Sequence, residues 1–136
     1  MIGAAVGIIV NDAKTLLCQR KRGSSYELKW EFPGGKIENN ETPEQCVVRE
    51  LNEELSIDAE SVILLDVVDA AYSDDNVYRV FYFYINQYSG NISNIVFEEI
   101  EWVVSDRILS MDILSGNREF IESYVQGKYQ LLMKEV

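Results

Sequence analysis

Three glutamates near the middle of the chain are spaced to act together on one face of a helix. Glu50, Glu53 and Glu54 stand at i, i+3 and i+4, so a helix would place them within an arc of about 100°. Like charges this close repel, and each i,i+4 pair costs up to about 0.5 kcal/mol. A bound divalent cation would turn that repulsion into coordination. The alternative is an ordinary solvated acidic face.

The rest of the composition narrows the metal chemistry that is possible. The 136 residues contain no histidine, which excludes a Ser-His-Asp site, a Cys-His site and any His-ligated zinc site. Cys18 and Cys46 have neither the spacing of a metal site nor the count of a disulfide framework, so we expect reduced thiols. Carboxylates must therefore hold any metal, which favours Mg²⁺ or Mn²⁺.

Charge and hydropathy restrict the partners. With 23 acidic and 12 basic residues the net charge is −11, which argues against binding a nucleic-acid polymer. No apolar run is long enough to cross a bilayer, and the N-terminus lacks the features of a signal peptide. We expect a cytoplasmic protein without a membrane partner, either a monomer or a homodimer.

The elements that must position the glutamates form one domain over residues 1–136, with 47% apolar residues. Runs rich in apolar and β-branched residues predict strands over residues 4–10, 15–19, 30–32, 62–68, 77–85 and 100–104. An amphipathic helix is predicted to close the chain, with Phe120, Ile121, Tyr124, Val125, Leu131 and Leu132 on its apolar face. The fold class is α/β (α+β), an α/β/α sandwich with a mixed central sheet.

The acidic helix carries clear start signals. Thr42 can cap it, Pro43 suits the first helical position, and Gln45 completes a capping box. The helix is predicted to run from Pro43 to about Leu55. Four apolar positions form a predicted core-facing stripe: Val47, Val48, Leu51 and Leu55.

The segments around this helix differ in charge. The segment from Gly35 to Ile57 contains six glutamates and two basic residues. The segment from Lys14 to Lys36 contains six basic residues and two acidic ones. Gly34 and Gly35 leave backbone carbonyls accessible just before the helix. An acidic metal cradle beside a basic segment is suited to a metal-bound polyphosphate.

Residues 35–57 resemble the Nudix box, Gly-x5-Glu-x7-Arg-Glu-U-x-Glu-Glu-x-Gly-U, where U is aliphatic. The matching residues are Gly35, Glu41, Arg49, Glu50, Leu51, Glu53, Glu54 and Ile57. Ser56 stands where the family has glycine, and a left-handed conformation there would cost roughly 1 kcal/mol without removing a metal ligand. The wider stretch from Trp30 to Gln45 resembles the MutT branch.

The resemblance implies roles for the box residues. Glu50, Glu53 and Glu54 would bind Mg²⁺ or Mn²⁺, assisted by a backbone carbonyl of Gly34 or Gly35. Arg49 would pair with Glu41 and brace the loop against the helix, although a plain surface ion pair is the alternative.

It also implies substrate contacts. Arg20 stands where MutT-like enzymes have a nucleotide-binding arginine, and Lys36 is a candidate phosphate contact, although both suit ordinary charged surface residues. Glu31 and Phe32 fall where the family lines the base pocket, but Phe32 also suits a core position. Asn117 corresponds to a purine-reading asparagine, and an N-cap is the competing interpretation. One tyrosine among residues 72, 78, 82, 84 and 88 can stack on a base.

By resemblance, the chain is a MutT-like nucleoside triphosphate pyrophosphohydrolase that releases a nucleoside monophosphate and pyrophosphate. Its substrate would be 8-oxo-dGTP or another oxidised nucleotide, linked to DNA repair, or a CTP-like pyrimidine. The alternatives are a Nudix hydrolase of ADP-ribose, NADH or dinucleoside polyphosphates, and a non-catalytic nucleotide sensor. The MutT branch also has a glutamate before the final strand that enters the metal site. Here Glu101 is our first choice for a general base and Glu98 the second, with Glu53 next.

Overall fold

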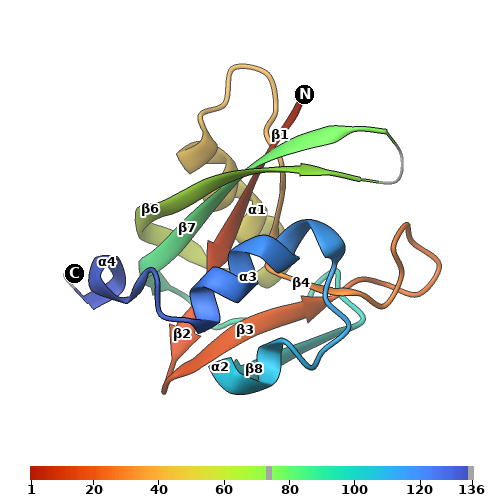
Figure 1. Cartoon of the computed structure of the whole chain (residues 1–136). Coiled ribbons are helices and arrows are strands. Elements are labelled where there is room, and N and C mark those ends of the chain that lie inside the picture. Colours follow the sequence, from red (N-terminus) through yellow and green to blue (C-terminus); the bar gives the residue numbers. More distant parts are fainter. Residues whose placement is uncertain (73–74, 135–136) are drawn as a thin grey trace.

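The computed structural model describes residues 1–72 and 75–134 (Figure 1). The strands are β1 (Ile2–Ile8), β2 (Val10–Asn11), β3 (Lys14–Gln19), β4 (Trp30–Glu31), β5 (Gly34–Lys36), β6 (Asp58–Ala71), β7 (Val77–Ser89) and β8 (Glu99–Val104). The helices are α1 (Pro43–Leu55), α2 (Ser105–Ile108), the 3-10 turn η1 (Ser115–Asn117), α3 (Arg118–Val125) and α4 (Gln130–Lys134). No helix in the described part of the chain is both long and apolar enough to span a membrane.

Two sheets organise the fold. The first has the order β5-β1-β7-β6, in which β1 and β7 are parallel and the other neighbours are antiparallel. In the second, β3 pairs antiparallel with β2, β4 and β8. The first sheet is therefore mixed, as the sequence predicted.

Side-chain alternation along the central strands divides the core between two faces. Val6 of β1 and Tyr82 of β7 pack with Phe120 of α3. Their neighbours Ala5 and Phe83 belong instead to the cluster that contains the buried side of α1. Figure 1 shows α1 and α3 on opposite sides of β1 and β7. This arrangement confirms the predicted α/β/α layering.

Helix α1 begins and ends where its sequence signals predicted. Thr42 Oγ1 accepts from the backbone N–H of Gln45 at 3.1 Å, and Gln45 Oε1 accepts from the N–H of Thr42 at 2.9 Å. The predicted stripe was wrong at Val48, which is 36% exposed, whereas Cys46 is buried. At 100° per residue, Cys46 and Leu55 lie at the two edges of an arc of about 180°, and Val48 lies outside this arc. Glu50 and Glu54 fall inside the arc, so they face the sheet.

The C-terminal region differs from the predicted single helix. It forms α3 and α4, separated by a turn in which Gly127 has a φ of 88°. The turn changes the helix direction, so Tyr129 is buried while Leu131 is 76% exposed. Strands β6 and β7 are also longer than predicted. They form a hairpin that pairs from Asp58 with Ser89 to Ala71 with Val77, so backbone pairing carries strand structure beyond the apolar runs.

Candidate active site

The box glutamates meet the glycines of β5. This strand pairs antiparallel with β1, with Gly35 opposite Ala5. The Glu50 carboxylate lies so close to Gly35 that a Cβ placed there would be 2.6 Å from it. The backbone N–H of Gly34 donates to Glu54 Oε1 at 2.9 Å. The two-glycine segment therefore provides space for one carboxylate and a hydrogen bond for another.

Arg49 joins the loop before α1 to the acidic face of the helix. Its guanidinium donates to the Glu41 carboxylate at 2.7 and 3.0 Å and to the Lys36 carbonyl at 3.2 Å. It also contacts Glu50 at 2.9 Å and Glu53 at 3.2 Å. The predicted pair of Arg49 with Glu41 is thus present. Its hydrogen bonds lower the pKa of the Glu41 carboxyl to about 2.

Burial and mutual repulsion make the carboxyl groups of Glu50 and Glu54 hard to ionise. Burial, followed by the charge of Glu50, raises the pKa of Glu54 to about 8 despite the Gly34 hydrogen bond. Burial also raises the pKa of Glu50, although Arg49 opposes the shift. The charge of Glu53 contributes to both increases. A nearby cation would relieve this cost of ionisation.

The donor set fits a divalent cation. Glu50, Glu53 and Glu54, with the carbonyls of Gly34 and Gly35, supply oxygen atoms alone, which suits Mg²⁺ or Mn²⁺. In the part of the chain that the structure describes, no three acidic or thiol side chains already converge as a ligand group. Arg49 holds Glu50 and Glu53, while Glu54 turns to the Gly34 amide. Metal binding would therefore require the carboxylates to release these partners.

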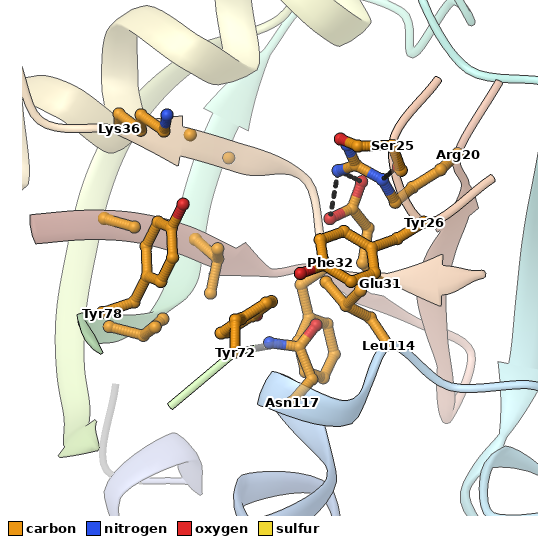
Figure 2. Close-up of a pocket in the computed structure, with 15 residues that line it drawn as sticks. Arg20, Ser25, Tyr26, Glu31, Phe32, Lys36, Tyr72, Tyr78, Leu114 and Asn117 are labelled. Carbon is orange, nitrogen blue, oxygen red and sulfur yellow. Dashed lines mark hydrogen bonds and ion pairs between the residues drawn. The ribbon is translucent and has the colours of Figure 1, made fainter. Parts of the chain in front are cut away.

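A pocket of about 550 Å³ opens beside this glycine segment (Figure 2). That volume lies within the range of roughly 300–1,000 Å³ that is typical of small-molecule sites. Its lining comprises Ala4, Val6, Arg20, Ser25, Tyr26, Glu31, Phe32, Gly34, Gly35, Lys36, Tyr72, Tyr78, Val80, Leu114 and Asn117. All five residues that the sequence suggested for substrate binding are among them. The structure thus gathers residues that are almost 100 positions apart in the chain around one cavity beside the glutamates.

Arg20 and Glu31 form a charged pair on the pocket wall. Arg20 Nη1 lies 3.2 Å from Glu31 Oε2, and Arg20 also donates to the Ser25 carbonyl at 2.8 Å. Burial raises the pKa of the Glu31 carboxyl to about 7, although Arg20 lowers it. Ionisation of Glu31 therefore costs more free energy than that of an exposed carboxyl group.

Asn117 is a pocket residue and not a side-chain cap. It is 4% exposed and precedes α3, but its side chain makes no cap hydrogen bond. Its Nδ2 instead donates to the Tyr82 hydroxyl at 3.0 Å. Its backbone is already helical, with φ −96° and ψ −9°, whereas a capping residue usually has extended backbone. Asn117 therefore occupies the N-cap position of α3, but its side chain does not cap the helix.

The remaining suggested residues occupy distinct places. Phe32 both lines the pocket and packs in the core, edge-on to Tyr82 and Phe120. Lys36 lies on β5, on the side of the pocket away from Asn117 (Figure 2). Among the tyrosines considered for stacking, Tyr72 and Tyr78 line the pocket, whereas Tyr84 lines a different cavity.

Sequence reasoning missed Tyr26, which lines the pocket from the loop before β4. Its ring is edge-on to Tyr72, with centroids 5.6 Å apart. The Tyr72 ring in turn lies 4.8 Å from that of Tyr78. Three tyrosines from different segments therefore form an aromatic wall. The aromatic residue in an otherwise polar loop was the available signal, but its partners became visible only in the fold.

The structure does not place Glu98 or Glu101 among the pocket-lining residues. Glu98 Oε1 accepts from the backbone N–H of Arg22 at 3.1 Å. Glu101 lies on β8 opposite Leu17 and pairs with Arg107 at 3.1 Å. Their assignment as general bases stays a prediction.

Comparisons with known proteins agree with this architecture. The model of the NUDIX domain matches residues 1–124. An 8-oxo-dGTP diphosphatase from Proteus vulgaris is 42% identical over 79 residues, which cover 57% of this chain and 70% of that protein. A CTP pyrophosphohydrolase from Escherichia coli is 49% identical over 59 residues, or 43% of this chain and 44% of that protein. The matches to curated relatives thus span from less than half to about two thirds of each protein.

Solved structures match over more of the chain. The E. coli ORF135 protein superposes with a TM-score of 0.82 at 27% identity, covering 93% of this chain and 89% of that one. A MutT NUDIX hydrolase from Burkholderia pseudomallei gives a TM-score of 0.80 at 28% identity, with coverage of 89% and 95%. Given the shared fold and the intact box carboxylates, the chain belongs to the NUDIX family, is similar to its MutT members, and is a hydrolase acting on phosphoric anhydrides.

Proposed function

We propose that the chain is a nucleoside triphosphate pyrophosphohydrolase that depends on Mg²⁺ or Mn²⁺. The observation that carries the proposal is the continuity of the 550 Å³ pocket with the glycine segment, on which two of the box carboxylates lie. A base can enter between Asn117 and the tyrosines while the phosphates extend toward Gly34 and Gly35. Water would attack the β-phosphorus, which releases a nucleoside monophosphate and pyrophosphate.

The residues of the chain would divide the work. Glu50, Glu53 and Glu54 would hold the cation, which supplies charge neutralisation and an activated water when bound. Lys36 and Arg20 provide positive charge along the pocket wall, suited to phosphate or ribose oxygens. Arg49 would hold the loop that follows β5, through its contacts with Glu41 and the Lys36 carbonyl.

The attacking water needs a base within hydrogen-bond reach. We propose Glu101 first and Glu98 second, since both lie outside the box. Glu101 pairs with Arg107, and Glu98 accepts from the Arg22 amide, so each carboxylate would have to exchange that partner for the attacking water. If neither serves, Glu53 is the next choice, because it is the most exposed box carboxylate.

The substrate would be 8-oxo-dGTP or a related oxidised nucleotide, or a CTP-like pyrimidine. Relatives named 8-oxo-dGTP diphosphatase and CTP pyrophosphohydrolase support both classes. We further propose that residues 1–136 form one cytoplasmic domain, active as a monomer or homodimer, with a role in DNA repair if the oxidised purine is the substrate.

A panel of nucleotides tests this proposal. Purified protein with Mg²⁺ should release pyrophosphate from at least one nucleoside triphosphate faster than it cleaves ADP-ribose, NADH or diadenosine polyphosphates. A preference for one of those three would move the chain to another Nudix class. Absence of turnover together with tight nucleotide binding would favour the non-catalytic sensor.

A further inference from the structure

The Asn117 amide is held at one end and unpaired at the other. Its Nδ2 donates to the Tyr82 hydroxyl at 3.0 Å. Its Oδ1 is buried and has no hydrogen-bond partner among the described residues. Figure 2 shows this oxygen turned toward the interior of the pocket. A buried acceptor without a partner costs free energy, which a ligand donor would recover.

Tyr82 determines which end of the amide faces the pocket. Its hydroxyl lies 3.4 Å from the Gly116 carbonyl, which can only accept a hydrogen bond. When the hydroxyl proton points to that carbonyl, the hydroxyl oxygen remains to accept from an amide nitrogen. The opposite orientation of Asn117 would draw the same proton away from Gly116. The short chain from Gly116 through Tyr82 to Asn117 therefore favours an amide that presents oxygen to the pocket.

Packing fixes the hydroxyl in this position. The Tyr82 ring stacks on Phe120 with centroids 3.9 Å apart and an interplanar angle of 3°. Phe32 lies edge-on to the same ring, with centroids 6.1 Å apart. Tyr82 is fully buried, so water does not compete for its hydroxyl. The acceptor is thus organised before a ligand enters.

We propose that Tyr82 is a positioning residue for base selection, which orients Asn117 so that the pocket favours a base with an N–H or NH₂ donor at that point. This rests on the proposed function only in that the pocket receives the base of a nucleotide. The donors of this kind include the exocyclic amines of adenine and cytosine and the N7–H of 8-oxo-purines. In unmodified purines N7 carries no hydrogen and is an acceptor. Tyr82 itself does not line the pocket, so its effect must pass through Asn117.

Equilibrium binding of nucleoside monophosphates tests the proposal without metal or turnover. The matched pairs are AMP with IMP, CMP with UMP, and 8-oxo-dGMP with dGMP, and the first member of each is the donor member. The exocyclic amine of AMP and CMP is a carbonyl in IMP and UMP, in which the adjacent ring nitrogen gains a hydrogen. The N7–H of 8-oxo-dGMP is a bare acceptor nitrogen in dGMP. The wild-type protein should bind the donor member of at least one pair about tenfold more tightly. Tyr82→Phe, which keeps the ring but frees the amide, should bring that Kd ratio close to 1. Tyr84→Phe on the same strand, which lines another cavity, should keep the wild-type ratio.

A double-mutant cycle separates positioning from general packing. Asn117→Ala should also remove the preference, and adding Tyr82→Phe to it should change the ratio no further. The proposal is overturned if the wild type binds the donor member more tightly in none of the three pairs, or if it binds no monophosphate. It is also overturned if folded Tyr82→Phe keeps the wild-type ratio of Kd values. Should Tyr82→Phe not fold, an unchanged ratio in Asn117→Ala overturns it. Donor-selective binding without hydrolysis would reject the proposed catalysis alone.

Discussion

Glu53 differs from the other box glutamates because it is the least constrained by the fold. Its side chain is 57% exposed, whereas Glu50 and Glu54 lie against the glycine segment. We expect Glu53→Gln to lower kcat by about two decades or more, because metal charge stabilisation contributes several kcal/mol. The fold should survive, since the amide keeps the shape of the side chain. Pyrophosphate release and circular dichroism measure the two effects.

The matched control is Glu44→Gln, an exposed glutamate in the first turn of the same helix. It should retain wild-type kcat. Folded Glu53→Gln with near-normal Mg²⁺-dependent turnover would remove Glu53 from the metal site. In the same assay, Glu101→Gln and Glu98→Gln decide the base, because the variant that lacks it should lose about two decades.

Glu31 should make stability depend on pH. Its folded pKa is about 7 against an ordinary 4.5, so the folded state binds the proton more tightly than the unfolded state. The contribution to stability is therefore fully present below pH 4.5 and is lost as the pH rises to about 7. Glu31→Gln should make the fall in unfolding free energy over this interval shallower, as measured by urea denaturation. Exposed Glu122→Gln should keep the wild-type slope, and an identical slope in both variants would contradict the buried, protonated state.

Asn117 shows why residue type alone could not settle this site. The sequence allowed both a cap and a base contact. Its actual partner, Tyr82, is 35 positions away and on another element. The hydroxyl of that tyrosine draws the amide away from the helix end, which no local pattern near Asn117 encodes.

At the scale of the element, α1 ends on a residue that its conformation does not favour. Ser56 has φ 61° and ψ 34°, the left-handed conformation expected from the family glycine that it replaces. Ser56→Gly should raise the unfolding free energy by about 1 kcal/mol, because glycine adopts this conformation without a Cβ penalty. Urea denaturation measures the change. Ser56→Ala, which keeps the Cβ, should bring no such gain, and equal stability of the two variants would exclude strain at this cap.

Helix α1 and the C-terminal region show which elements the sequence can predict. Helix α1 was predicted with its bounds because Thr42, Pro43 and Gln45 give local start signals. The prediction of a single C-terminal helix was wrong because the apolar spacing continues across Gly127, although the chain turns there. The division of the core explains the difference, since burial of Tyr129 beneath the sheet outweighs helical continuity and leaves Leu131 exposed.

At the scale of the whole molecule, the fold lines one cavity with part of the basic segment and places the acidic helix α1 against the glycines at its edge. The α/β/α layering could be predicted from the order of the elements, and the acidic face of α1 could be predicted from the spacing of its glutamates. The pocket itself could not be predicted in this way, because its walls come from β1, the loop before β4, β5, the segment after β6, β7 and the turn before α3. Such a cavity depends on strand register and long-range packing, which the chain specifies only collectively.

The site of bond cleavage tests the central claim most directly. Hydrolysis of the best nucleoside triphosphate in ¹⁸O-labelled water, with and without Mg²⁺, can be followed by mass spectrometry of the products. Attack at the β-phosphorus predicts equal amounts of nucleoside monophosphate and pyrophosphate, with the label in pyrophosphate and no reaction without the cation. Formation of nucleoside diphosphate and phosphate, label in the monophosphate, or full activity after metal removal would contradict the account.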